Sequence, residues 1–155
     1  MKKMIVRLAA VVALASMTTF AMAADWNKDQ AAVWSVVTQS WEDEVAKNGN
    51  WPKDYVHKDV VAWGESWPQP REAASIAKWS RFGEKTDTTL IYELFPVSIV
   101  VVGSTAIVNY NTVSVGNNYE GKRERSTQGL IETLVYDGKS WRFLSLTSFE
   151  INSDH

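Results

Sequence analysis

Cysteine is absent from this 155-residue chain, and histidine is scarce, with two residues in total. Without cysteine the protein has no disulfide bond, no thiolate metal site and no cysteine nucleophile. The two histidines, His57 and His155, lie far apart in the sequence and do not form the ligand set of a zinc site. We therefore expect no metal and no other cofactor.

A hydrophobic run long enough to cross a membrane is also missing. Residues 8–20 are mostly apolar, but this run is shorter than the roughly 20 residues of a transmembrane helix. The run follows three basic residues and precedes a small-residue cleavage pattern that ends at Ala23. This arrangement predicts a secretory signal peptide over residues 1–23, a mature domain over residues 24–155, and a periplasmic or secreted location. We expect no membrane insertion after the signal peptide is removed.

Positive charge is not in excess. The chain has 16 basic and 18 acidic residues, and three of the basic residues lie in the predicted signal peptide. The mature domain therefore carries 13 basic residues against 18 acidic ones, a net charge of −5. An acidic surface is unsuited to binding nucleic acid or an anionic membrane, so we expect neither as a partner.

Tryptophan is abundant, and its distribution divides the chain. Seven of the eight tryptophans lie between Trp26 and Phe82, where apolar residues recur at helical spacing. From Thr88 onward the pattern is that of long β-strands joined by short turns. This order predicts an α+β fold with a cone-like, curved antiparallel sheet that about three N-terminal helices cover on one face. The predicted helices span residues 26–47, 52–55 and 70–82, and the predicted strands span residues 60–62, 89–102, 105–115, 123–136 and 141–151.

The last predicted hairpin carries apolar residues on both faces. A turn of two or of four residues at Asp137 pairs Trp141 with Leu134 or with Tyr136, and both registers give each side chain the same face. One face then holds Glu132 among Leu130, Leu134, Tyr136, Trp141, Phe143, Ser145 and Thr147. The other face holds Ile131, Thr133, Val135, Leu144 and Leu146. Because helices cover one face only, and each exposed aliphatic side chain forfeits about 1.5–3 kcal/mol, we expect a homodimer through the sheet.

Three stretches carry a family resemblance: residues 55–64 (YVHKDVVAWG), 70–79 (PREAASIAKW) and 136–143 (YDGKSWRF). In this order they resemble the nuclear transport factor 2-like superfamily, which includes ketosteroid isomerase, scytalone dehydratase and the SnoaL-like polyketide cyclases. The resemblance covers essentially the whole mature chain. It implies a cone-shaped α+β domain in which helices close over a curved sheet whose mouth holds a ligand pocket.

The catalytic residues of that superfamily lack full counterparts here. Many SnoaL-like proteins have a histidine six residues after the hairpin tryptophan, where this chain has Thr147. Ketosteroid isomerases use a tyrosine on the first helix as an oxyanion donor, and the predicted first helix contains none. Scytalone dehydratase relies on two pocket histidines, and this chain offers only His57. The resemblance therefore implies a fold and a pocket, without a complete catalytic set.

The leading functional hypothesis is an exported small-molecule-binding domain with an aromatic pocket between the helices and the sheet. For Trp34, Trp41 and Trp79 the alternative is packing in the core, because they follow helical spacing. Another hypothesis is a protein-interaction module of the cell envelope, anchored by Trp51 and Trp67, which precede prolines in loops and are expected to be exposed. The candidate ligand-binding residues are Trp34, Trp41, Tyr55, Trp63, Trp67, Trp79, Asn109 and Arg125.

A third hypothesis is a proton-transfer enzyme, such as a dehydratase, isomerase or cyclase, that acts on a small apolar substrate. Its candidate catalytic bases are His57 and Glu132, and Asn109 or Arg125 would polarise the substrate. Glu132 stands among apolar strand residues, where burial raises the pKa of a carboxyl group. The alternative for Glu132 is an ion pair across the sheet or a contact in the dimer interface.

Overall fold

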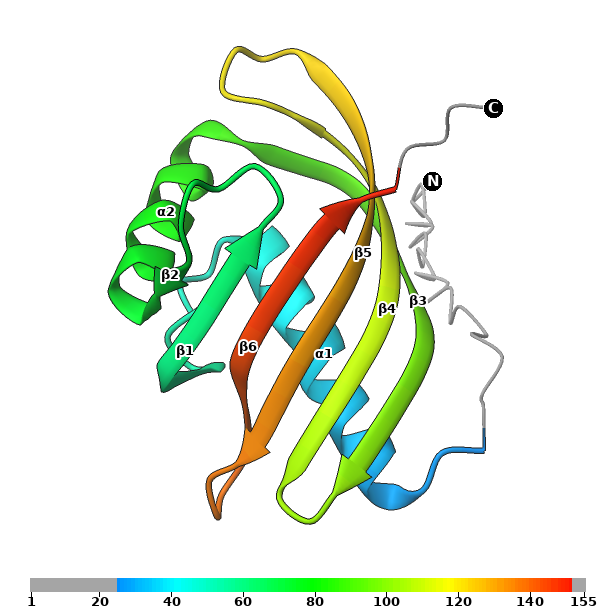
Figure 1. Ribbon diagram of the computed structural model, residues 1–155. Coiled ribbons are helices and arrows are strands. Elements are labelled where there is room, and N and C mark those ends of the chain that lie inside the picture. Colours follow the sequence, from blue (N-terminus) through cyan, green and yellow to red (C-terminus); the bar gives the residue numbers. More distant parts are fainter. Residues whose placement is uncertain (1–24, 152–155) are drawn as a thin grey trace, which may run out of the picture.

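The computed structural model describes residues 25–151, and the predicted signal peptide lies outside this range. Two helices and six strands follow one another along the chain (Figure 1). Their bounds are α1 Lys28–Ala46, β1 Val56–Gly64, β2 Arg71–Glu72, α2 Ala73–Thr86, β3 Thr88–Val102, β4 Thr105–Asn117, β5 Arg123–Tyr136 and β6 Trp141–Glu150. None of the described helices is long and apolar enough to span a membrane.

The prediction of about three helices is wrong, because the described chain has two. Residues 52–55 form turns, in which the backbone N–H groups of Tyr55 and Val56 both donate to the carbonyl of Pro52. A helix nucleus of this length fixes several residues for few hydrogen bonds, so it does not propagate. The four long strands after Asp87 match their predicted ranges to within two residues at each end.

The sheet is mixed, whereas the sequence predicted an antiparallel one. Its strand order is β2-β1-β6-β5-β4-β3, and β1 runs parallel to β6 while all other neighbours are antiparallel. Parallel neighbours need a long connection, and here the segment from α2 to β5 provides it. The outermost strand β3 contains Pro96 beside a register shift, where a residue without a backbone N–H is tolerated.

Helix α1 packs across one face of the sheet, which we call the inner face (Figure 1). Asn27 caps this helix by accepting hydrogen bonds from the backbone N–H groups of Asp29 and Gln30. The helix buries Val33 and Val37 completely, one turn apart. They pack in a core with sheet residues Ile99, Ala106, Val108, Tyr110, Leu134, Trp141 and Phe143.

The last hairpin adopts one of the two predicted registers, with a four-residue turn that pairs Tyr136 with Trp141. Leu134 pairs with Phe143, but Thr133 pairs with Ser145, so β6 has an extra residue at Leu144. A bulge of this kind reverses the facing of every later side chain. Leu146 therefore lies opposite Glu132, and the predicted placement of Ser145 and Thr147 on that face is wrong.

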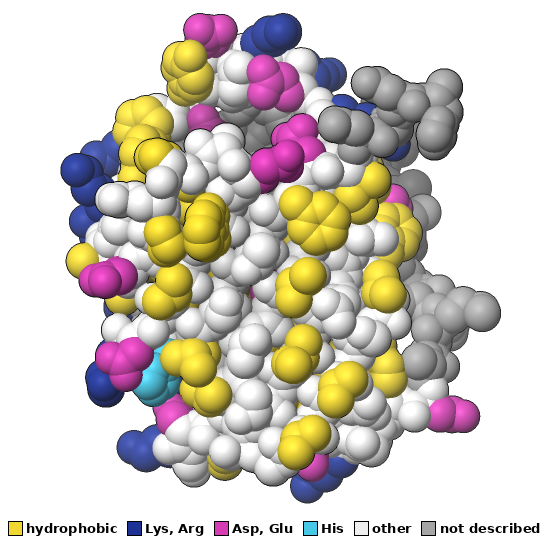
Figure 2. Space-filling view, in the orientation of Figure 1, with side chains coloured by type: hydrophobic (Ala, Val, Ile, Leu, Met, Phe, Trp, Pro, Cys, Tyr) yellow, Lys and Arg dark blue, Asp and Glu magenta, His cyan; other side chains and the backbone are white. Residues whose placement is uncertain are grey.

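The outer face of the sheet carries no helix. Figure 2 shows hydrophobic side chains spread over this face, separated by polar groups and backbone. Val100, Ile107 and Ile131 are 52%, 43% and 44% exposed, respectively. The second face of the sheet is therefore apolar, as predicted, and it is exposed to solvent in the described chain.

Candidate functional site

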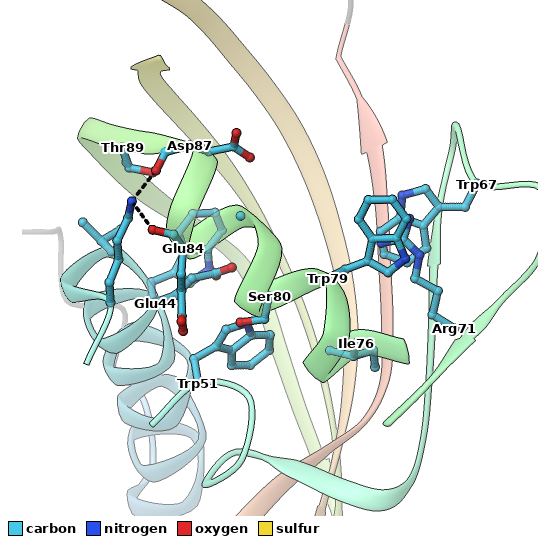
Figure 3. Close-up of a pocket in the computed structure, with 14 residues that line it drawn as sticks. Glu44, Trp51, Trp67, Arg71, Ile76, Trp79, Ser80, Glu84, Asp87 and Thr89 are labelled. Carbon is cyan, nitrogen blue, oxygen red and sulfur yellow. Dashed lines mark hydrogen bonds between the residues drawn. The ribbon is translucent and has the colours of Figure 1, made fainter. Parts of the chain in front are cut away.

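A cleft opens where the C-terminal half of α1, helix α2 and the inner face of the sheet meet. It consists of two adjacent cavities of about 370 and 130 Å³. Four residues line both cavities: Trp41, Glu44, Trp51 and Trp67. The first cavity extends along α2, as Figure 3 shows, and the second extends onto the floor formed by the sheet. We call the two cavities together the cleft.

Indole rings from four parts of the chain form the walls of the cleft. Trp41 comes from α1, Trp51 from the turn that follows it, Trp67 from the loop after β1, and Trp79 from α2. Trp63 on β1 lies at the edge of the second cavity, but it is in the same row of the sheet as the outward-facing Ile131, so its side chain, which is 53% exposed, points away from the cleft. Elements distant in sequence thus combine to give an apolar, aromatic lining of the type found in small-molecule sites.

The cation of Arg71 is held between two of these indoles (Figure 3). Its guanidinium carbon lies 3.7 Å from the ring centroid of Trp67 and 4.5 Å from that of Trp79. Both contacts are within the range of cation–π attraction. Burial among these rings lowers the pKa of Arg71 below its ordinary value.

Glu132 is the buried carboxyl group at the floor of the second cavity. It is 5% exposed and lies in one row of the sheet with Val108, Leu146 and Ala62. Its Oε1 accepts a hydrogen bond of 3.0 Å from the hydroxyl group of Tyr110, whereas its Oε2 is buried without a partner. Desolvation raises the pKa of Glu132 to about 8, which the hydrogen bond from Tyr110 opposes and the charge of Glu44 reinforces.

A chain of hydrogen bonds fixes the position of Glu132 relative to α1. The indole Nε1 of Trp41 donates to the Tyr110 hydroxyl oxygen at 2.8 Å, and this hydroxyl group in turn donates to Glu132. The pKa of Tyr110 is raised, first by burial and then by the charge of Glu132. Tyr110 therefore stays a neutral donor, and the carboxyl group is held in one orientation by two packed aromatic residues.

Glu44 supplies a second carboxyl group to both cavities. It follows Trp41 by three residues on α1, a spacing that places both side chains on the same side of the helix. The cleft admits solvent to Glu44, yet protein surrounds it, and desolvation followed by the charge of Glu84 raises its pKa to about 7. Nearby, Lys47 donates to the backbone carbonyl oxygens of Glu84 and Asp87 (Figure 3).

The structure divides the predicted ligand-binding tryptophans and Tyr55 into two groups. Trp41, Trp67 and Trp79 line the cleft, whereas Trp63 reaches only its edge and directs its side chain to the outer face. Trp34 instead meets Tyr110 edge to face at 5.6 Å and packs against the core, and Tyr55 donates to Asp43 while it packs on Trp51. Trp34 therefore packs against the core, which was the alternative predicted for it. Neither Trp34 nor Tyr55 lines either cavity.

The polar candidates His57, Asn109 and Arg125 do not lie with Glu132. His57 is the second residue of β1, where its Nδ1 accepts a hydrogen bond from the backbone N–H of Asp59 at 3.2 Å. Asn109 and Arg125 face outward from β4 and β5, since each alternates with the buried inner-face residues. Asn109 donates to Ser98 on the outer face. Of the predicted polar residues, only Glu132 contributes to the cleft.

The residues predicted to bind a ligand did not include Glu44 or Arg71, and Trp51 was predicted only as an anchor for a partner protein. The spacing of Glu44 from Trp41 contained a usable signal, because residues three apart share a helix face. Trp51 and Trp67 were expected to be exposed, and this is wrong, since both are partly buried in the cleft. Arg71 had no local signal, because Trp67 and Trp79 meet around it only after α2 folds back.

The described residues 25–151 contain no group of three or more histidine or acidic side chains arranged to hold a metal ion. The cleft instead offers carboxyl groups, indole rings and one stacked guanidinium group. These groups can bind an apolar body and a polar or charged substituent, and the buried carboxyl group can exchange a proton.

Comparison with solved structures shows an NTF2-like fold. A ketosteroid isomerase-like protein from Erwinia carotovora atroseptica superposes with a TM-score of 0.71 at 14% identity, over 82% of this chain and 99% of that one. An NTF2-like protein from Cytophaga hutchinsonii gives a TM-score of 0.67 at 12% identity, over 81% of this chain and 100% of the other. No protein-family model matches the sequence, and a search among curated proteins found no match.

Another similar structure is an NTF2-like protein of unknown function in nutrient uptake from Rhodospirillum rubrum. Its TM-score is 0.67 at 11% identity, over 77% of this chain and 98% of that protein. Likeness at such low identity establishes the fold and not the activity, since one fold supports many functions. The fold that the three sequence stretches implied is confirmed.

Proposed function

We propose that this protein is an exported domain that binds a small, partly apolar molecule in the cleft between α1, α2 and the sheet. The observation that carries the proposal is the pair of adjacent cavities walled by Trp41, Trp51 and Trp67. Their volumes of about 370 and 130 Å³ suit a compact organic molecule. The export component rests on the predicted signal peptide at residues 1–23.

The aromatic lining favours binding over simple core packing. The core of the protein lies further along α1, around Val33 and Val37, where the residues are fully buried. In the cleft, by contrast, Trp79 is 49% exposed. Indoles that remain open to solvent forfeit hydrophobic free energy that a bound apolar molecule would recover.

Binding can be tested by isothermal titration with three small probes: 2-phenylethanol, indole and cyclohexanol. We expect at least one probe to bind, and the Trp67→Ala variant to bind it several-fold more weakly, because Trp67 lines both cavities. Tyr119→Ala is the matched control, since Tyr119 is 69% exposed and lines neither cavity. Equal loss of affinity in both variants, or no binding of any probe, would argue against the proposal.

A second candidate function is proton transfer by Glu132. Its pKa of about 8 suits exchange of a proton near neutral pH, and its Oε2 is free of protein partners. Among the predicted bases, only Glu132 lines the cleft, so a mechanism that uses His57, Asn109 or Arg125 lacks support. Tyr110 would orient the carboxyl group through its hydrogen bond to Oε1.

The proton-transfer function is tested by deuterium incorporation into a simple enone, 2-cyclohexenone, followed by NMR in D₂O. We expect the protein to accelerate exchange at the acidic carbon, and Glu132→Gln to abolish the acceleration because the amide cannot take up the proton. Glu120→Gln, in the β4–β5 loop, is the control. Exchange that the Glu132→Gln variant supports as well as the parent protein would rule out this role.

A further inference from the structure

We propose that the molecule bound in the cleft is a small organic amine, whose ammonium group binds between Glu44 and Glu132 and whose apolar part contacts the indole rings. The inference rests on the proposed function, because it names the chemical class of the ligand for the same cleft. It follows from an excess of carboxyl groups over basic groups, an unpartnered oxygen atom and the nature of the walls.

Acidic residues outnumber basic ones around the cleft. Four acidic residues line it, against the two basic residues Lys47 and Arg71: Glu44, Glu84, Asp87 and Glu132. Lys47 is engaged with two backbone carbonyl oxygens, and Arg71 is stacked between indoles. No salt bridge formed within residues 25–151 includes any of the four carboxylates. The charges of Glu84 and Asp87 offset those of Lys47 and Arg71, so the two remaining carboxyl groups, Glu44 and Glu132, decide which ligand charge the cleft prefers. Both have raised pKa values, and a ligand with a positive charge favours their ionised forms, whereas an anion does not.

Glu132 provides the second, independent observation. Only 5% of Glu132 is exposed, and its Oε2 has no hydrogen-bond partner among the described residues. A buried polar atom without a partner is costly, and native structures satisfy such atoms by a partner or a bound molecule. An ammonium group carries three donors and no acceptor, so it can donate to Glu132 and to Glu44 at once.

The walls of the second cavity suit the rest of such a ligand. Trp41, Trp51 and Trp67 present aromatic surface around it. Cations are attracted to the faces of indole rings, and the cleft already holds one cation in this way, the guanidinium group of Arg71. Arg71 occupies Trp67 and Trp79, which leaves Trp41 and Trp51 beside the carboxyl groups of Glu44 and Glu132.

The test uses isothermal titration with three probes that share a phenylethyl frame and differ in charge: 2-phenylethylamine, 2-phenylethanol and phenylacetate. We expect the amine to bind at least about tenfold more tightly than the alcohol, and the carboxylate to bind weakest. Equal or tighter binding of the alcohol or carboxylate overturns the inference and leaves the proposed function standing. Failure of all three probes, together with failure of indole and cyclohexanol, overturns both.

Substitutions at the carboxyl groups show whether the preference for the amine arises where we propose. Glu132→Gln and Glu44→Gln should each weaken 2-phenylethylamine about tenfold and leave 2-phenylethanol within about twofold. Glu120→Gln should change neither, because Glu120 lies in the β4–β5 loop outside both cavities. An amine preference that survives in the Glu44→Gln, Glu132→Gln double variant would overturn the inference.

Proton release provides a readout that does not depend on affinity. Binding of the ammonium group favours the ionised carboxylate, so the proton of Glu132 leaves to solvent as the amine binds. At pH 7, titrations of 2-phenylethylamine in buffers of different ionisation enthalpy should show net proton release, and the Glu132→Gln variant should show less. Proton uptake in the parent protein would contradict the proposed contact.

Discussion

At the scale of single residues, the feature that decides the chemistry of the cleft is the environment of Glu132. The same carboxyl group on the surface would be ionised at neutral pH and would interact weakly with its neighbours. Here burial raises its pKa, while Tyr110 fixes one oxygen and leaves the other free. The residue therefore holds a proton that a ligand can displace.

This environment predicts a dependence of stability on pH. Folded Glu132 keeps its proton up to pH about 8, whereas the unfolded chain releases it near pH 4.5. The native state therefore binds more protons between these values, and the free energy of unfolding should fall as pH rises from 5 to 8. The shift corresponds to roughly 2–5 kcal/mol over this range, and Glu44, with a pKa raised to about 7, contributes in the same direction.

Urea denaturation of the parent protein and of Glu132→Gln at several pH values measures this dependence. The uncharged variant should lose less stability between pH 5 and 8, and it should exceed the parent in stability at the upper end. Glu120→Gln serves as the control, and its curve should parallel that of the parent. Parallel curves for the parent and Glu132→Gln would show that Glu132 is not held protonated.

At the scale of elements, the loop between β1 and β2 controls the wall of the cleft. A methyl group at Gly64 would lie 2.9 Å from Cε2 and 3.1 Å from Cδ2 of Trp67. A contact this short forces the indole to move. Overpacking of this kind costs about 1–3 kcal/mol. Its movement would also disturb Arg71, which stacks on the same ring.

The Gly64→Ala variant should therefore bind cleft probes about tenfold more weakly and remain folded. Gly64 has no positive φ, so the alanine strains side-chain packing and not the backbone. Ser66→Ala, in the same loop but exposed, should bind like the parent. Titration calorimetry with circular dichroism compares the variants; undiminished binding by Gly64→Ala would show that the position of Trp67 is unimportant.

The elements also show what the sequence can reveal. The long strands were predictable because alternation continues over many residues and glycine-containing turns separate the strands. The bulge at Leu144 was not, because both faces of β6 carry apolar residues, and the small polar residues Ser145 and Thr147 are compatible with either face. The same ambiguity hid the outward direction of Asn109.

The site was predictable only in part. Glu132 could be identified because it interrupts an apolar strand face, and the structure confirms its burial. Trp41 could be placed on the apolar stripe of α1. Whether it lies in the core or in the cleft depends on the position of α2, which the local sequence does not give. Arg71 and Trp79 meet through a tertiary contact that no local pattern encodes.

At the scale of the whole molecule, the outer face of the sheet predicts self-association. Exposed Val100, Ile107 and Ile131 lie on three neighbouring strands, away from α1. A second copy that covers this apolar and uncharged group would recover roughly 1.5–3 kcal/mol for each fully buried side chain. We propose a homodimer through this face.

Sedimentation velocity at micromolar concentration should therefore give about twice the mass of one protomer. Ile107→Asp should produce a monomer, since it would bury a charge in the interface. The control Tyr119→Asp lies in the β4–β5 loop and should leave the dimer intact. A monomeric parent protein at these concentrations would reject the dimer.

The central claim is that the cleft binds a small apolar amine, and a crystal structure of the full chain with 2-phenylethylamine tests it most directly. We predict the phenyl ring beside Trp41 and Trp51, with the nitrogen within hydrogen-bond distance of Glu132 Oε2. A cleft that remains empty at saturating amine, or an amine bound only elsewhere on the protein, would contradict the account.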